Sequence, residues 1–155
     1  MKNKIVFLLI LPFVLASCSE SPVIPTAEES QAAITEKINM ANERWAGGDP
    51  MGFVDCAAQD ITWMDDLMAP VPIKGREALK TYLEGFRGQI PAHTMELTNM
   101  DFQNYGDIVI VTYHYEGTFE GVSNPPWKVT SVYRYADNDW LSVHENWTVV
   151  EEPSE

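Results

Sequence analysis

The spacing of apolar residues changes once along the chain, near Pro91, and this change constrains the fold more than any other feature. Before Pro91, apolar residues recur at the three- and four-residue spacing of helices. After it, β-branched and aromatic residues dominate the ranges 93–103, 107–119, 127–135 and 140–150, which is typical of strands. Helices followed by a run of strands predict an α+β fold with an antiparallel sheet packed on the helices.

The half of the chain before Pro91 is predicted to form three helices and one strand. The first helix follows a capping box that begins at Thr26, and it stops at Gly47-Gly48. The second follows Asp49-Pro50, which offers an N-cap and a proline in the first turn. The predicted set comprises helices at 27–46, 50–58 and 76–86 and a strand at 61–66.

The first 18 residues resemble the signal of bacterial lipoproteins. Lys2 and Lys4 precede an apolar run that is too short for a permanent membrane span, and Leu-Ala-Ser-Cys then ends at Cys18. In such signals the cysteine is lipidated and becomes the first residue of the mature chain. We therefore expect a signal peptide at 1–17, a lipidated Cys18 with a tether at 18–26, and one folded domain at 27–152.

This signal predicts a lipid-anchored protein of the bacterial cell envelope. Ser19 after the cysteine is compatible with the periplasmic face of the outer membrane if the cell is Gram-negative. Removal of residues 1–17 leaves 138 residues, which suits one domain. Because Lys2 and Lys4 leave with the signal, the formal net charge falls from −13 to −15. That charge argues against nucleic-acid binding and leaves membrane attachment to the acyl chains.

No disulfide, metal site or cofactor is predicted. Once Cys18 carries lipid, Cys56 is the only thiol left, so an intramolecular disulfide is excluded. The sequence has no His or Cys pair at metal-ligand spacing and no glycine-rich phosphate loop.

The last strand carries one candidate site residue, Glu145. Strict alternation places it on the face of Leu141, Val143, Trp147 and Val149, which is otherwise apolar. A buried glutamate is costly unless it is paired, hydrogen-bonded or protonated, so Glu145 requires a partner or a cavity. An exposed strand end, or neutralisation by an arginine, would explain Glu145 without any function.

The strand at 61–66 carries the second candidate, Asp65, on the same face as Ile61 and Trp63. Burial beside Trp63 would disfavour the charged form of this carboxylate, which is the tuning that a general base requires. Alternatively, Asp65 and Asp66 simply begin a turn before the following prolines. Both interpretations remain open from the residues alone.

Five segments, in order and spacing, resemble the nuclear transport factor 2-like superfamily, and within it the SnoaL-like and ketosteroid isomerase-like domains. The resemblance covers roughly residues 30–150, so the domain at 27–152 is expected to be SnoaL-like. It implies a cone-shaped, curved antiparallel sheet packed on three N-terminal helices, also called cystatin-like, with a pocket between them. The segments are Trp45–Asp49, Asp60–Asp65, Gly75–Leu79, Val132–Tyr135 and Asp139–Thr148.

The resemblance also implies site residues. The catalytic base of ketosteroid isomerases is an Asp at the end of the first strand, which matches Asp65, and pocket positions match Val143, Glu145 and Trp147. The Asp of the isomerase oxyanion hole aligns near Ser131. Its helix-one Tyr has no counterpart in the first helix of this chain, so we do not expect steroid isomerisation.

The histidines and Arg134 bear on two other activities of the superfamily. Dehydratases of the superfamily use a His and Asp pair. His93 lies two and four residues from Met95 and Leu97, which places all three on one face of the strand, so His93 can reach the pocket mouth. Epoxide hydrolases need an Asp-Arg-Asp set, which the strand around Arg134 does not reproduce.

Two functions follow as hypotheses. In the first, a membrane-anchored domain binds a small apolar or aromatic ligand whose polar end is fixed by Asp65 and Glu145. In the second, a small hydrolase, isomerase or dehydratase uses Asp65 as general base and Glu145 as acid or hydrogen-bond donor. The predicted ligand-binding residues are Trp63, Tyr113, Ser131, Tyr133, Val143 and Trp147.

The resemblance further implies a homodimer formed through the convex face of the sheet. On a strict alternation along the last strand, Trp140, Ser142, His144 and Asn146 would lie at that interface.

Overall fold

The structure is a computed structural model that describes residues 23–66 and 69–150. The predicted signal peptide and Cys18 lie outside the described residues. Within the described part of the chain, no helix has the length and apolar character needed to cross a membrane.

Three helices form where the sequence predicts them: α1 at Ala27–Ala46, α2 at Met51–Cys56 and α3 at Arg76–Glu84. The predicted capping box at Thr26 is present, since its hydroxyl accepts from the Glu29 N–H while its own N–H donates to the Glu29 carboxylate at 2.8 Å. Helices α2 and α3 each end two residues before the predicted position, and α2 does so because the chain turns to extended backbone at Ala57.

The strands form one curved, seven-stranded sheet in the order β2-β1-β7-β6-β4-β3, with β5 paired to β4. The four longest strands pair antiparallel in the order β3, β4, β6, β7, as the sequence predicts. One pair differs in direction, because β1 runs parallel to β7. The strands are β1 (Ala57–Asp65), β2 (Ala69–Lys74), β3 (Thr94–Asn104), β4 (Ile108–Phe119), β5 (Val122–Ser123), β6 (Trp127–Ala136) and β7 (Asp139–Val149).

Two strands are not predicted by the sequence, β2 and β5. Strand β2 contains Pro70 and Pro72, which predict a turn rather than a strand. It pairs only with β1 at the edge of the sheet, where the missing N–H of a proline need not break a ladder hydrogen bond. Its position next to β1 holds the end of β1, and therefore Asp65, inside the fold.

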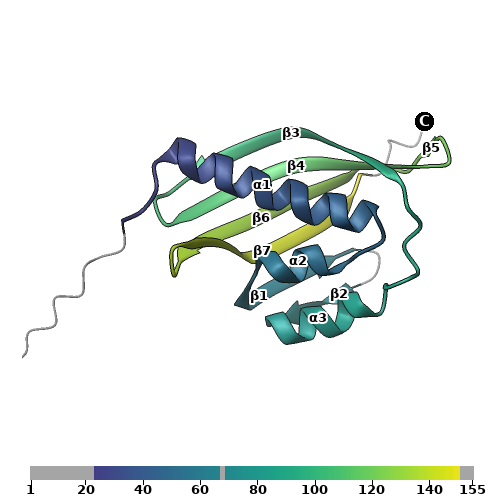
Figure 1. Cartoon of the computed structure of the whole chain (residues 1–155), viewed down its shortest axis with the longest axis horizontal. Coiled ribbons are helices and arrows are strands. Elements are labelled where there is room, and N and C mark those ends of the chain that lie inside the picture. The colour runs from purple at the N-terminus through teal and green to yellow at the C-terminus, as the bar shows by residue number, and fades with distance from the viewer. Residues whose placement is uncertain (1–22, 67–68, 151–155) are drawn as a thin grey trace, which may run out of the picture.

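All three helices lie on one side of the sheet (Figure 1). The apolar side chains of the helices pack against the inward face of the central strands. For example, Ile34 and Ile38 of α1 belong to the same hydrophobic core as Val109 and Val111 of β4. Inward residues of β4 alternate strictly, since Val109, Val111, Tyr113 and Tyr115 are buried and the residues between them are half-buried.

Strand β7 breaks this alternation and corrects the face that the sequence predicts. Val132 of β6 pairs with His144 while the next residue pairs with Ser142, so Val143 is an extra residue in a bulge. Before the bulge Trp140 and Ser142 point inward, each only 2% exposed, and after it Glu145 and Trp147 do. The predictions for Leu141 and Val143 on the inward face, and for Trp140 and Ser142 at a convex-face interface, are therefore wrong.

Candidate functional site

A cavity of about 80 Å³, open to solvent on one side, lies between the helices and the sheet. Aromatic side chains make most of its wall, and Asp65 is the one charged residue among those that line it. The wall consists of Trp45, Phe53, Trp63, Asp65, Tyr82, Leu83, Phe86, Tyr115, Trp127 and Trp147.

Trp147 of β7 is the centre of the aromatic wall. It stacks on Trp63 of the neighbouring strand with ring centroids 5.8 Å apart, and Phe53 of α2 meets it edge-on at 5.5 Å. Tyr115 and Trp127 approach it at 6.0 and 6.3 Å. One side chain thus joins wall residues from α2, β1, β4 and β6.

Asp65 enters the wall at the end of β1, paired in register with Trp147 of β7. Its side chain is almost covered, since the residue is 6% exposed. The Tyr82 hydroxyl of α3 donates to its Oδ2 at 3.4 Å. Burial, and then the neighbouring Asp65 carboxylate, raise the pKa of Tyr82, which keeps this phenol protonated as a donor.

Glu145 is buried, but it is not among the residues that line the cavity. Its two carboxyl oxygens accept from Ser131 Oγ at 2.5 Å and from Ser142 Oγ at 2.7 Å. Burial raises the pKa of Glu145 to about 7, although both serine hydrogen bonds act in the opposite direction. The structure therefore separates the two carboxylates that the sequence assigns to one pocket.

The other predicted ligand-binding residues divide into two groups. Trp63 and Trp147 line the cavity. Tyr113, Ser131 and Tyr133 face inward but are fully packed in the core beside Glu145, and none of them lines the cavity. Val143 lies in the bulge, half-buried, and does not line it either.

Tyr115 lines the cavity but is not among the predicted ligand-binding residues, and it contacts His93, which the sequence predicts near the pocket mouth. The Tyr115 hydroxyl lies 2.5 Å from His93 Nε2, and His93 Nδ1 lies 2.9 Å from the Pro91 carbonyl oxygen. Because a carbonyl only accepts, Nδ1 carries the proton in neutral His93, and Tyr115 is the donor to Nε2. Gly117 makes room for this ring, since a Cβ there would lie 3.3 Å from His93 Cδ2.

The helical wall residues are also absent from the sequence prediction. The alternation of residues along β4 could have predicted Tyr115 as inward-facing, because it lies on the same face as Tyr113. No local pattern shows which aromatic residues of the helices contact a strand across the core. These residues are Trp45, Phe53, Tyr82 and Leu83, together with Phe86 in the turn just after α3.

The described residues hold no group of three or more His, Cys, Asp or Glu side chains that could bind a metal ion. Cys56 is a buried free thiol, and burial raises its pKa to about 11. Such a thiol stays protonated at neutral pH and acts as a small apolar side chain of the core.

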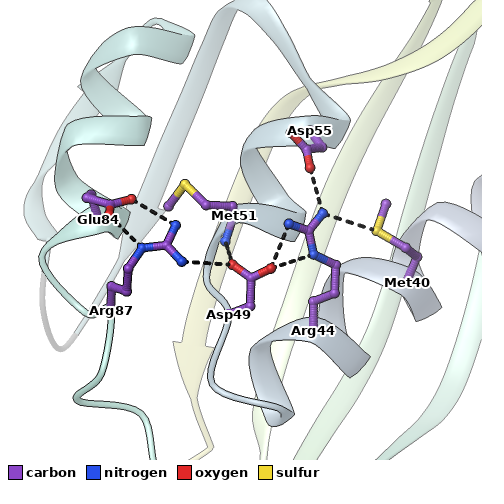
Figure 2. A network of polar contacts seen from close by, with 7 residues as sticks. All are labelled: Met40, Arg44, Asp49, Met51, Asp55, Glu84 and Arg87. Atoms are coloured by element: carbon purple, nitrogen blue, oxygen red, sulfur yellow. Dashed lines mark hydrogen bonds and ion pairs between the residues drawn. The ribbon is translucent and has the colours of Figure 1, made fainter.

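An ion-pair network ties together the helix ends that carry part of the wall (Figure 2). Arg44 at the end of α1 contacts Asp49 at 2.7 Å and Asp55 of α2 at 2.6 Å. Arg87 after α3 contacts Glu84, and reaches Asp49 at 3.8 Å. Asp49 also accepts from the N–H of Met51, the first residue of α2, at 3.0 Å, so one carboxylate contacts the start of α2 and both arginines.

We expect Arg44→Met to lower the free energy of unfolding by about 1 kcal/mol at low salt, because it removes two partly exposed ion pairs. Much of this difference should disappear at about 1 M NaCl, where such pairs are screened. Urea unfolding at both salt concentrations measures it. Arg134→Met, which removes the exposed pair with Asp60, is the control and should change stability less. Equal losses in the two variants would contradict a role for the network.

Comparison with known proteins agrees with this architecture. The profile of the SnoaL-like domain matches residues 39–143. A protein from Parabacteroides distasonis ATCC 8503, described provisionally as a ketosteroid isomerase, is 28% identical, with a TM-score of 0.63, over 74% of this chain and 85% of that chain. No curated protein matches the chain.

Two more distant structures share the fold. An NTF2-like protein of unknown function from Pseudomonas putida KT2440 has a TM-score of 0.70 at 21% identity, over 84% of this chain and 92% of that one. An NTF2-like protein from Streptomyces avermitilis, described provisionally as a dehydratase, has a TM-score of 0.65 at 14% identity, over 81% and 99%. With the profile covering most of the domain, the chain belongs to the SnoaL-like family of the nuclear transport factor 2-like superfamily.

Proposed function

We propose that this protein binds a small apolar or aromatic ligand in the cavity, with Asp65 holding the polar end. The observation that carries this proposal is a solvent-open cavity with an aromatic wall and one carboxylate. Such a combination, apolar surface with few polar groups, is typical of small-molecule sites. Glu145 is not part of this proposal, because it is packed in the core against Ser131 and Ser142 and is absent from the wall.

The cavity volume limits what it can enclose. A dry cavity of about 150 Å³ admits benzene. At about 80 Å³, this cavity has roughly half that volume, so it would enclose only part of a ring-sized group, with the rest at the open side.

Trp127→Ala tests the binding proposal, because Trp127 is a half-buried wall residue and its loss should leave the fold intact. We expect a panel of small one-ring compounds to change the tryptophan fluorescence of the wild-type protein, and this variant to weaken that binding about tenfold. Tyr105→Ala, at an exposed hairpin turn, is the matched control. Equal binding by both variants, or no binding by the wild type, would contradict the proposal.

A second candidate function is proton abstraction by Asp65 in an isomerase or dehydratase. It is supported by the position of Asp65 at the end of the first strand, in an apolar cavity, and by the family's resemblance to ketosteroid isomerases. In this form Glu145 is not the acid or hydrogen-bond donor, because it does not line the cavity. Loss of turnover in Asp65→Asn with retained ligand binding would separate this function from binding alone.

We further propose that Cys18 carries the lipid anchor and that the domain is a homodimer. The support for the anchor is the signal sequence itself. Cys18→Ser should move the protein from the detergent phase to the aqueous phase in a phase-partition assay, and an unchanged distribution would reject the anchor. Light scattering tests the dimer, and a monomer mass would reject it.

A further inference from the structure

The two tyrosines of the cavity wall, Tyr82 and Tyr115, both donate their hydroxyl protons in hydrogen bonds to other side chains of the protein. Tyr82 donates to Asp65 Oδ2, and Tyr115 donates to His93 Nε2, whose other nitrogen is held by a backbone carbonyl. Both phenol oxygens therefore present lone pairs, rather than protons, to a bound molecule. A ligand that needs hydrogen-bond donors, such as a carbonyl compound or an anion, finds none in these side chains.

The central indole groups do not supply donors either. The Nε1 atoms of Trp63 and Trp147 are covered, and neither has a hydrogen-bond partner among the described residues. What these two side chains contribute to the cavity surface is therefore ring carbon. Of the indoles in the wall, Trp45 and Trp127, which are half-buried, remain as N–H donors.

The charge of the wall favours a cation. Asp65 is its one charged residue, and none of the described Lys, Arg or His side chains lines the cavity. A neutral ligand adds no charge of opposite sign beside this carboxylate, and an anion adds repulsion. A cationic ligand compensates the carboxylate, and the formal net charge of −13 attracts cations to the molecule as a whole.

The aromatic wall favours one kind of cation. Eight of the ten wall residues are Trp, Tyr or Phe. Aromatic faces attract cations, and quaternary ammonium groups are recognised by cages of such rings. A trimethylammonium group carries its charge on methyl groups, which suits a wall made mostly of aromatic ring carbon.

We propose that the cavity binds the trimethylammonium head of an alkylammonium ligand, with the aromatic rings around the methyl groups and the Asp65 carboxylate beside the charge. This rests on the proposed binding function and names its ligand class. The cavity would enclose part of this head group, and the remainder with its substituent would lie at the open side. The family membership alone does not imply such a ligand.

The test compares two probes of nearly equal shape, choline and 3,3-dimethylbutan-1-ol, in which a carbon replaces the charged nitrogen. Titrations of the purified protein are followed by tryptophan fluorescence and by calorimetry. We expect choline to bind about tenfold more tightly than the alcohol. This comparison needs no variant, so it does not depend on whether a substitution disturbs the fold.

Two matched variants then locate the charge. Asp65→Asn should weaken choline binding by about tenfold and leave binding of the alcohol within about twofold. Asp66→Asn, one residue along on the exposed side, should change neither affinity. Trp127→Leu keeps apolar surface but removes a ring, so it should weaken choline more than the alcohol. Thermal unfolding checks that each variant is folded.

The outcomes separate this inference from the proposed function. If the alcohol binds as tightly as choline, or if Asp65→Asn weakens both probes equally, the cation inference is overturned while the apolar binding site stands. If neither probe binds, the cation inference is overturned, and the one-ring panel with Trp127→Ala decides whether the binding function fails as well.

Discussion

Replacing Trp147 by alanine should lower the free energy of unfolding by about 4 kcal/mol, more than the loss of any ion pair at the helix ends. Trp147 is 8% exposed and contacts four wall residues, among them Phe53 and Trp63, as well as Tyr113 in the core. Alanine leaves a void among groups from four different elements, and these groups cannot all move inward. Urea unfolding followed by circular dichroism measures the loss.

A graded series makes this prediction specific. Trp147→Phe keeps an aromatic ring of smaller volume and should lose less than half as much stability as the alanine variant. Trp127→Ala should also lose less, because Trp127 is half-buried and lies at the rim of the cluster. A loss of under about 1 kcal/mol in Trp147→Ala would mean that the aromatic cluster does not hold helices and sheet together.

Replacing Glu145 by glutamine should stabilise the protein above pH 7 by up to about 3 kcal/mol, because burial raises the pKa of Glu145 from 4.5 to about 7. The neutral acid donates to one serine and accepts from the other, and the glutamine amide can do the same with Ser131 and Ser142. The ionised carboxylate is held in the core at a cost that glutamine avoids.

The pH dependence follows from the direction of this shift. Below about pH 4 the carboxyl group is protonated in both the folded and the unfolded states, so wild type and Glu145→Gln differ little. Between about pH 4.5 and 7 the unfolded state loses this proton while the folded state keeps it. The wild type therefore loses stability relative to the variant as pH rises, and above about pH 7 the difference becomes constant.

Unfolding midpoints in urea from pH 4 to pH 8.5 measure this difference. Glu36→Gln, on the exposed side of α1, is the control and should follow the wild-type curve. Parallel curves for wild type and Glu145→Gln would show that Glu145 is ionised in the folded protein at little cost, which would contradict the raised pKa of Glu145.

The sequence by itself determined the three helices, the five longest strands, the α+β class and the family. Thr26 and Gly47 bound α1 because a capping box and a glycine act over a few neighbouring residues. In β1, a period of two puts Ile61, Trp63 and Asp65 on one face, and all three are buried. These features depend on short-range geometry, which local sequence specifies.

Only the tertiary structure decided which residues form the cavity and which carboxylate reaches it. The bulge at Val143 shifts the inward face of β7 by one residue, and it exists because of the pairing of β7 with β6, not because of the β7 sequence alone. Strand β2 forms despite two prolines because β1 offers it an edge. The cavity wall gathers side chains from three helices and four strands, and such contacts are fixed by packing across the core, which no local periodicity encodes.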